Sequence, residues 1–323
     1  MLQSFIPSIL ERSIVRVLVT GASGFIGRVL SQRLTDLGCR VIPVSRSNGT
    51  DLTAWQEVQA LEPADAVCHL AGVIPRVQEI SPREIYLANM IGALHVLEYC
   101  RLNGVRAMVL ASSYVYGAPQ YLPVDEAHPL GGQGPYARSK ILAEELARAY
   151  GTDHGLSVVA LRIFNAYGPG QEGDMLLPTI LSQAIKGGEV VLRDPDPRRD
   201  FVYVDDIVDA FLAALRDVGA GFRCYNIASG RTVSVREVVR ELEDAFGCHL
   251  PLRYTGERRS NEIMDCPGSN ALIAERLRWS PATPLREGIR RTVEWWKARL
   301  TARCEASVPA GPRGMAPPGS ACS

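Results

Sequence analysis

Gly21-Ala22-Ser23-Gly24-Phe25-Ile26-Gly27 is the stretch of sequence from which the fold can be read. It directly follows an apolar, β-branched run at residues 14–20, and apolar residues recur at helical spacing from Phe25 to Leu37. Glycines spaced as GxxGxxG let the backbone turn sharply and approach a pyrophosphate, which the free N–H groups at the helix start attract. A purely structural turn is the alternative, but the strand–turn–helix context favours a dinucleotide-binding loop.

The pattern around this loop predicts the fold class. Further strands are expected at 40–44, 65–70, 107–112 and 157–163, and helices at 51–61, 82–103 and 134–150. Such alternation predicts an α/β protein with a Rossmann-type, doubly wound parallel sheet. In the second half, helices are expected near 174–187, 205–216, 234–246 and 284–301, and short strands near 190–192, 201–204 and 224–227.

Three regions follow from this pattern. We expect residues 14–173 to form mainly the NAD(P)-binding domain and residues 174–301 mainly a smaller substrate-binding lobe whose segments interleave with the sheet. Residues 302–323 are rich in Pro and Gly and poor in apolar side chains, so we expect a disordered tail.

Composition excludes several classes of protein. The chain has 323 residues with 35 basic and 35 acidic side chains, so nucleic-acid binding through bulk charge is not expected. No apolar run approaches the ~18 residues that span a bilayer, and the N-terminus lacks the basic start of a signal peptide. The eight cysteines form no CxxC pair and the five histidines are dispersed, which argues against disulfides and a metal site. Together these features indicate a cytoplasmic protein with no membrane partner.

The second strand bears on the choice of cofactor. NAD sites usually carry an acid there for the ribose hydroxyls, whereas this strand ends in Val44-Ser45-Arg46-Ser47 without one. Arg46 could pair with a 2′-phosphate, which favours NADP, or it could be a solvated surface charge. We expect Asp51 and Leu52, with Leu70-Ala71-Gly72, to line the adenine and the wall beside the phosphates.

Tyr136 and Lys140 form the candidate reactive pair. Because they are four residues apart, they share one face of a helix. A free tyrosine has a pKa near ~10, and a neighbouring ammonium favours the phenolate and lowers that pKa. Ser112 ends the fourth strand and could hydrogen-bond the same reacting oxygen. The three residues could therefore move a proton at a sugar hydroxyl while a nicotinamide moves the hydride.

Three motifs together resemble a known family. TGASGFIG at 20–27, ASSYVYG at 111–117 and PYARSK at 135–140 are similar to the extended short-chain dehydrogenases/reductases. Within these, the loop APQYLPVDEAHP at 118–129 resembles the nucleotide-sugar epimerases and dehydratases, above all the UDP-galactose 4-epimerases. The resemblance covers roughly residues 14–300.

The resemblance implies roles for individual residues. It assigns Ser112, Tyr136 and Lys140 to catalysis and implies a nucleotide-diphosphate sugar as the substrate. The residues that it and the cofactor pattern assign to the dinucleotide are Gly21, Gly24, Phe25, Ile26, Gly27, Arg46, Asp51, Leu52, Leu70, Ala71, Gly72, Asn89, Tyr136, Lys140 and Phe164. Those assigned to the substrate are Ser112, Ser113, Tyr136, Asn165, Arg199, Arg259 and Cys266.

The reaction itself is left between alternatives. The family's dehydratases carry an Asp-Glu pair after the Ser/Thr, where this chain has Ser113-Tyr114, so elimination of water is disfavoured. A 4-epimerase with bound NAD is favoured by overall similarity, and a 4-ketoreductase using NADPH is favoured by Arg46. A non-catalytic NADP sensor is the least favoured reading, since such relatives lack the Tyr/Lys pair. By the same resemblance, Cys266 aligns near the position where the epimerases gate substituents on the sugar C2, and a small side chain there would admit an N-acetyl group.

The resemblance also implies a homodimer built by the helices near 82–103 and 134–150. Core packing would explain the same apolar residues equally well. The residues concerned are Leu87, Ile91, Leu94, Tyr99, Leu142, Leu146 and Tyr150.

Overall fold

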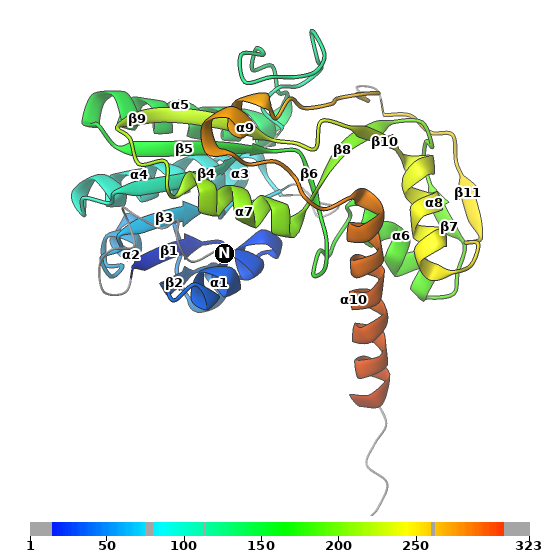
Figure 1. Ribbon diagram of the computed structural model, residues 1–323. Coiled ribbons are helices and arrows are strands. Elements are labelled where there is room, and N and C mark those ends of the chain that lie inside the picture. Colours follow the sequence, from blue (N-terminus) through cyan, green and yellow to red (C-terminus); the bar gives the residue numbers. More distant parts are fainter. Residues whose placement is uncertain (1–14, 75–79, 113, 260–261, 307–323) are drawn as a thin grey trace, which may run out of the picture.

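The computed structural model describes residues 15–74, 80–112, 114–259 and 262–306. Its main feature is a six-stranded sheet of order β2-β1-β3-β4-β5-β9, in which all neighbouring strands are parallel (Figure 1). Because the strand order reverses beside β1, a topological switch point lies at its carboxyl end, where ligands bind in such sheets. The strands are β1 (Arg16–Thr20), β2 (Arg40–Val44), β3 (Ala66–His69), β4 (Ala107–Ser112), β5 (Ser157–Ile163) and β9 (Gly221–Ile227).

Helices cover both faces of this sheet. Val17 and Val19 point to a core shared with α1, α7 and α9, while Leu18 points to a core shared with α2, α4 and α5. The predicted doubly wound, Rossmann-like sheet is therefore confirmed. The helices are α1 (Phe25–Asp36), α2 (Trp55–Gln59), α3 (Pro82–Tyr86), α4 (Gly92–Leu102), α5 (Gly134–His154), α7 (Val204–Ala214) and α9 (Ala271–Leu277).

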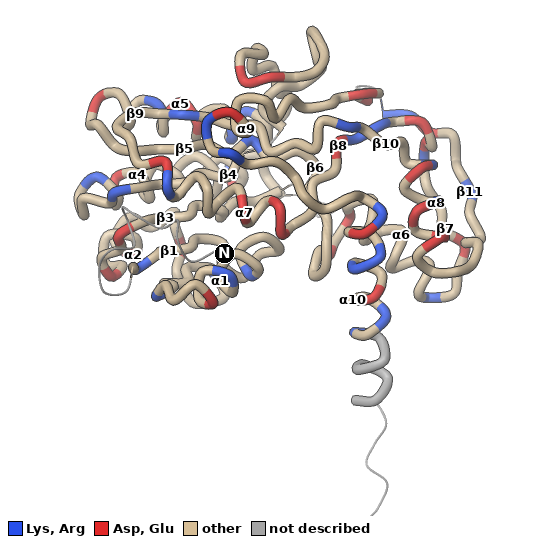
Figure 2. Tube along the Cα trace, in the orientation of Figure 1, with Lys and Arg blue, Asp and Glu red and all other residues tan. Residues whose placement is uncertain are grey.

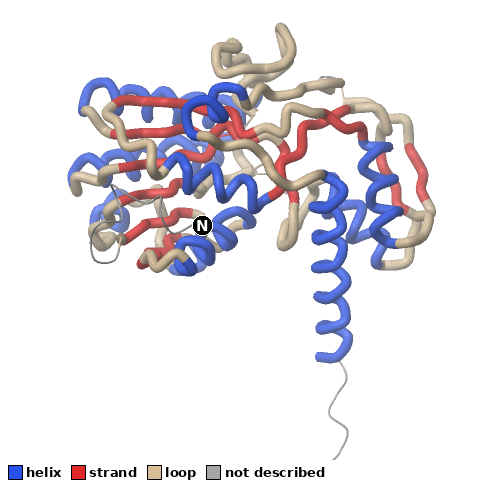
Figure 3. Tube along the Cα trace, viewed as in Figure 1, coloured by secondary structure: helices blue, strands red, loops and turns tan. Residues whose placement is uncertain are grey.

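A smaller lobe lies beside the sheet (Figures 1 and 3). It contains the three-stranded sheet β10-β8-β6 and the strand pair β11-β7, packed with α6, α8 and α10 around a separate apolar core. Its elements are β6 (Asn165–Tyr167), α6 (Leu176–Ile185), β7 (Val190–Leu192), β8 (Arg198–Tyr203), β10 (Thr232–Ser234), α8 (Val235–Phe246), β11 (Leu252–Tyr254) and α10 (Leu285–Ala306).

Most of the expected elements occur where the sequence places them. The bounds of β2, β4 and β5 agree with the expected ranges, but β6, β10, β11 and α9 were not expected. The expected helix at 82–103 is interrupted by a π-helical turn, η2 (Leu87–Ile91). Helix α10 continues to Ala306, beyond the expected start of the tail, and residues 307–323 lie outside the described part of the chain.

Charge is spread over the described surface. Basic and acidic residues are interspersed along both lobes and along α10 rather than gathered by sign (Figure 2). Within the described ranges, no helix is long and apolar enough to cross a membrane. Of the residues expected on a dimer surface, Leu142 is 42% exposed, but Tyr99 is 1% exposed and donates its hydroxyl to the Glu62 carbonyl. Tyr99 therefore belongs to the core.

Candidate active site

The glycine loop forms a narrow cradle between β1 and α1. Gly21 has φ +69°, and a Cβ there would lie 2.8 Å from the backbone nitrogen of Ala71. A Cβ on Gly27 would lie 2.1 Å from the carbonyl oxygen of Gly21. Gly24 is the N-cap of α1 and offers no side-chain cap, and the first turn carries no acidic residue. Because the backbone is bare and the helix N-terminus is open to an anion, the cradle fits a dinucleotide pyrophosphate.

Two walls flank the cradle. On one side, Phe25 and Ile26 pack against the core of the smaller lobe, which places α1 beside that lobe. On the other side, the Ala71 N–H donates to the Thr20 hydroxyl at 3.2 Å, which lies 2.8 Å from His69 Nδ1. These bonds hold the Leu70-Ala71 segment against the end of β1, where the sequence places the phosphate-side wall.

The end of β2 carries a cation and no carboxylate. Arg46 is exposed and begins η1 (Arg46–Asn48), directly after Ser45. Asp51 accepts a hydrogen bond from the Thr53 N–H at 2.9 Å, which stabilises its own turn. Leu52 is buried, and its carbonyl is 2.8 Å from His95 Nδ1. Arg46 is therefore the charged side chain that follows β2 directly, as the sequence indicated.

Asn89 joins the cofactor side of the site to α5. Its amide accepts from the Val73 N–H at 2.7 Å and donates to the Val73 carbonyl and to the Ser139 hydroxyl. Ser139 in turn donates to the carbonyl of Tyr136 at 2.7 Å. A Cβ on Gly72 would lie 3.0 Å from Asn89 Oδ1 and 3.7 Å from Lys140 Nζ, so the loop after β3 reaches the reactive helix.

The predicted catalytic residues lie where β4 and α5 meet. Lys140 donates from Nζ to the Ala111 carbonyl at 2.9 Å and is 7% exposed. Ser112 is buried, and its Oγ has no hydrogen-bond partner among the described residues. Tyr136 is half-buried and meets Tyr114 edge to face, with ring centroids 6.0 Å apart. An orphaned buried hydroxyl is costly, so Ser112 is suited to bind a substrate oxygen.

Burial tunes the charge of Lys140. Removal from water lowers the pKa of its ammonium to about 8, although the carboxylate of Glu144 acts to raise it. The pKa of this amine is therefore closer to neutral pH than that of an exposed lysine. At pH 7 the amine is still mostly an ammonium, which can stabilise a neighbouring phenolate.

The structure brings one residue predicted for the cofactor, Phe164, together with one predicted for the substrate, Cys266. Phe164 and Cys266 pack against one buried cluster formed by Val115, Tyr116 and Val124. Two members of this cluster, Val115 and Tyr116, lie shortly after Ser112 in the chain. Asn165 begins β6, and its amide donates to the Asp200 carbonyl at 3.0 Å.

The two arginines assigned to a diphosphate meet at one carboxylate. Arg199 forms an ion pair with Glu262 and donates to the carbonyls of Arg198 and Ile263 at 2.8 and 2.6 Å. Arg259 is exposed, and its Nε lies 3.9 Å from Glu262. Both guanidinium groups therefore face the same carboxylate. Ser113 lies outside the described residues.

Sequence reasoning missed a network of buried polar side chains between β5 and α5. Arg162 on β5 is bound by Glu144 of α5, and its Nη1 donates to the Tyr116 hydroxyl at 3.0 Å. That hydroxyl donates to Asn226 Oδ1 at 2.5 Å. A signal was present: Arg162 is an ionisable residue inside an apolar strand, and Glu144 follows Lys140 by one helical turn.

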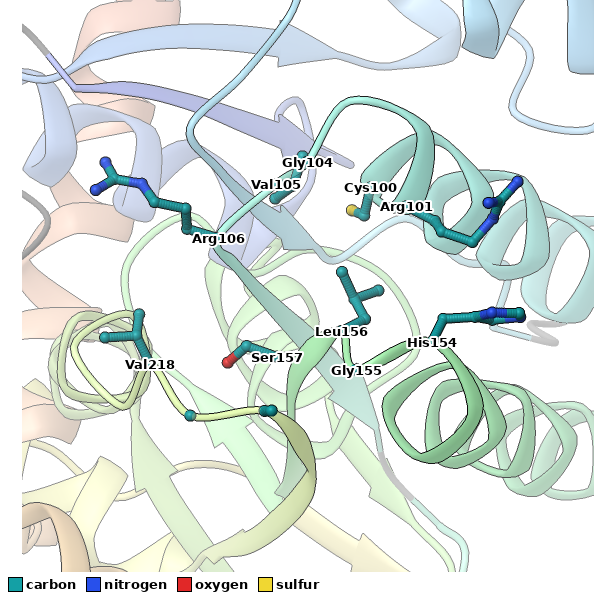
Figure 4. Close-up of a pocket in the computed structure, with 12 residues that line it drawn as sticks. Cys100, Arg101, Gly104, Val105, Arg106, His154, Gly155, Leu156, Ser157 and Val218 are labelled. Carbon is teal, nitrogen blue, oxygen red and sulfur yellow. The ribbon is translucent and has the colours of Figure 1, made fainter.

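A surface pocket lies at the opposite end of the sheet (Figure 4). It has a volume of about 440 Å³ and is lined from the amino ends of β4 and β5, the ends of α4 and α5, and residues 218–220. The side chains of Arg101, Arg106 and His154 extend outward from it in Figure 4. None of the residues assigned to cofactor or substrate lines this pocket. Within the described ranges, no cluster of His, Cys, Asp and Glu could hold a metal ion.

Comparisons with known proteins show which proteins this chain resembles. Residues 17–228 match the model of the NAD dependent epimerase/dehydratase family. The chain is 33% identical to the UDP-glucose 4-epimerase of Azospirillum brasilense, over 88% of this chain and 92% of that protein. It is 29% identical to the GDP-6-deoxy-D-mannose reductase of Pseudomonas aeruginosa, over 88% of this chain and 98% of that protein.

Two solved structures are also similar to this chain. MoeE5 in complex with UDP-glucose and NAD is 32% identical, with a TM-score of 0.80 over 88% of this chain and 99% of that one. RMD from Pseudomonas aeruginosa complexed with NADPH is 28% identical, with a TM-score of 0.79 over 88% of this chain and 99% of that one.

Proposed function

Because the chain belongs to the NAD-dependent epimerase/dehydratase family, we propose that it is a nucleotide-sugar 4-epimerase acting by transient oxidation at C4 and return of the hydride. The observation that supports the proposal is the hydrogen bond from Lys140 Nζ to the carbonyl of Ala111, which holds the helix that carries Tyr136 against the end of β4, next to Ser112. Similarity to UDP-glucose 4-epimerases over most of the chain favours epimerisation among the family's reactions.

The residues of this chain divide the chemistry between them. Tyr136 takes the proton from the C4 hydroxyl and returns it, because the Lys140 ammonium one turn along α5 favours its phenolate. Ser112 binds the same oxygen with its otherwise unpartnered hydroxyl. A bound nicotinamide would supply the chemistry of hydride removal from C4 and its return to the opposite face of the sugar. Gly21, Gly24 and Gly27 would hold its pyrophosphate, and Arg199 with Arg259 the diphosphate of the sugar.

One observation favours a second function, a 4-ketoreductase that uses NADPH. Arg46 is exposed at the end of β2, where an acid would bind the ribose of NAD, and a guanidinium suits a 2′-phosphate. The similarity to a reductase and to a structure holding NADPH supports the same reading. The absence of an Asp-Glu pair after Ser112 disfavours a dehydratase, and the presence of Tyr136 and Lys140 disfavours a non-catalytic sensor.

The dinucleotide that the protein carries distinguishes the two functions. An epimerase regenerates its cofactor, so denaturing the purified protein should release stoichiometric NAD. An empty site that binds NADPH more tightly than NADH would instead support the reductase, and Arg46→Ala should abolish that preference. Tyr136→Phe should remove most turnover and leave cofactor binding intact. If turnover survived in this variant, the proposed acid/base role would be wrong.

The proposal also includes a cytoplasmic homodimer. The exposed Leu142 on α5, with the half-buried Leu87, Ile91 and Leu94, supports an apolar surface on the helices expected to pair. Light scattering of the purified protein measures the assembly, and replacing Leu142 with Glu should shift it toward the monomer.

A further inference from the structure

The buried network contains one carboxylate, Glu144, with a bonded cation, Arg162, and a second buried cation, Lys140, one helical turn away. Glu144 and Arg162 have side chains only 1% and 3% exposed. Glu144 Oε2 accepts from Arg162 Nη2 at 2.7 Å, and both carboxylate oxygens accept from Nε at 3.2 and 3.1 Å. Lys140 precedes Glu144 by one turn of α5 and is also buried. Burying a cation without a counter-charge is strongly unfavourable, so the placement of this carboxylate matters for both.

Strand register places Arg162, the partner of Glu144, directly beside Ser112. Ser112, Arg162 and Asn226 are direct partners across β4, β5 and β9, so their side chains leave the sheet on the same face. This face is covered by α5, which carries Tyr136, Lys140 and Glu144 on successive turns. The carboxylate of Glu144 therefore lies between the reactive helix and the floor of the site.

Charged and titratable groups approach this region from several elements. His69 at the end of β3 is fully buried and stays neutral, because burial lowers its pKa to about 3. From the segment after β4, Tyr116 bonds Arg162, and Glu126 accepts the Asn226 N–H at 2.7 Å. Burial raises the pKa of the Tyr116 hydroxyl above its usual range and also raises that of Glu126. Cys224 on β9 is likewise kept as a thiol by a raised pKa.

Glu144 is the carboxylate that lies one helical turn from Lys140 on α5. We propose that Glu144 is a positioning residue of the reaction under the proposed function: its carboxylate, held in place by Arg162, is the counter-charge that keeps the Lys140 ammonium protonated one turn from Tyr136. Arg162 orients the carboxylate through three hydrogen bonds, and Glu144 acts on the site through Lys140 without touching the substrate.

The amino-acid composition makes a direct test feasible. Lys140, Lys186 and Lys297 are the only lysines in the sequence, so a protein labelled with ¹³C at the lysine side chains gives three Cε signals. Lys140→Arg identifies the signal of Lys140, and its chemical shift followed against pH gives the protonation of this amine without substrate or cofactor.

Three variants separate the charge of Glu144 from its packing. In Glu144→Gln the Lys140 signal should titrate at least about one pH unit lower than in the wild type, from a charge roughly one helical turn away. Glu144→Asp retains the charge and should restore most of the difference. Glu144→Gln with Arg162→Met leaves no unpaired guanidinium, so it remains informative if the single variant fails to fold, and it should still titrate lower than the wild type.

The matched control is Asp217→Asn. Asp217 forms a half-buried ion pair with Arg223 at the far end of β9, with an Nε–Oδ2 distance of 2.8 Å. Its loss should leave the Lys140 titration unchanged. If Lys140 titrated at the wild-type pH in both Glu144 variants without a carboxylate, or if Glu144→Asp behaved as Glu144→Gln, the inference would be wrong.

The consequence for turnover is a second, separable readout. If the protein turns over a nucleotide sugar, the basic limb of its pH–kcat profile should move to lower pH in Glu144→Gln with little change in KM. An unmoved limb would overturn the inference. If no nucleotide sugar reacts, the proposed function fails, while the lysine titration still decides the role of Glu144.

Discussion

Replacing Asp200 by Asn should destabilise the protein and weaken substrate binding. Asp200 is fully buried on β8 and accepts four hydrogen bonds: from the Ser229 N–H at 2.7 Å, the Ser229 hydroxyl at 2.6 Å, and the N–H groups of Gly230 and Gly268 at 3.0 and 3.1 Å. One carboxylate thus ties β8, which carries Arg199, to the segment that carries Cys266.

The size of the effect follows from counting donors. The asparagine amide must place its NH₂ group against Gly230 and Gly268, or against Ser229, whose hydroxyl can rotate to accept. The better orientation turns the NH₂ group toward Ser229, so the amide oxygen still accepts from Gly230 and Gly268. The buried N–H of Ser229 then faces a donor, which costs about 1–3 kcal/mol. The remaining bonds lose their charge assistance, so the free energy of unfolding should fall by about 3 kcal/mol in all. Urea unfolding of the variant measures this directly.

Asp206→Asn is the matched control. Asp206 is 3% exposed and accepts from the N–H groups of Ala282 and Thr283 at 3.1 Å, but it secures α7 rather than the substrate wall. Both variants should be less stable, whereas only Asp200→Asn should raise the Kd for a nucleoside diphosphate in calorimetry, by about tenfold, or 1.4 kcal/mol. Equal affinities in the two variants, or a stable Asp200→Asn protein, would refute this reasoning.

Three further predictions follow from the site. Gly27→Ala should reduce dinucleotide affinity by about tenfold or more in a fluorescence titration, because its Cβ would overlap the Gly21 carbonyl; Gly188→Ala, which has open space around it, should not. His69 stays neutral in the fold while the unfolded chain gains a proton, so this residue should lower the free energy of unfolding by about 2 kcal/mol between pH 7 and pH 5. Urea unfolding at both pH values should show that this component is absent in His69→Asn, and an equal pH dependence would contradict it. Cys266→Tyr should abolish turnover of N-acetylhexosamine nucleotides and spare plain hexoses, as coupled assays on both substrates would show; unchanged selectivity would remove Cys266 as a gate.

Local patterns were sufficient for much of the fold and for part of the site. Strands such as Ala107–Ser112 and Ser157–Ile163 are mostly apolar, as strands buried on both faces of a parallel sheet are, and their bounds agree with those read from the sequence. The GxxGxxG loop and the Tyr136/Lys140 pair are recognisable because each lies within a few residues of chain, where spacing alone decides geometry.

Other features depended on contacts between distant residues. The three-residue strands β6, β10 and β11 have too little pattern of their own and exist because a neighbouring strand satisfies their backbone. The convergence of Arg199 and Arg259 on Glu262 arises where separate segments meet. The sequence left Tyr99 open between a dimer surface and the core, because a helical apolar position does not show which neighbour covers it; the structure places it in the core.

The sequence by itself determined the kind of protein: a doubly wound α/β fold with a dinucleotide loop and a tyrosine–lysine pair. Only the tertiary structure decided how the charges beneath that pair are balanced. Glu144 and Arg162 are 18 residues apart, on a helix and a strand that meet only when α5 packs on the sheet. The energy of a buried charge depends on what surrounds it in space, and periodicity along the chain does not encode that.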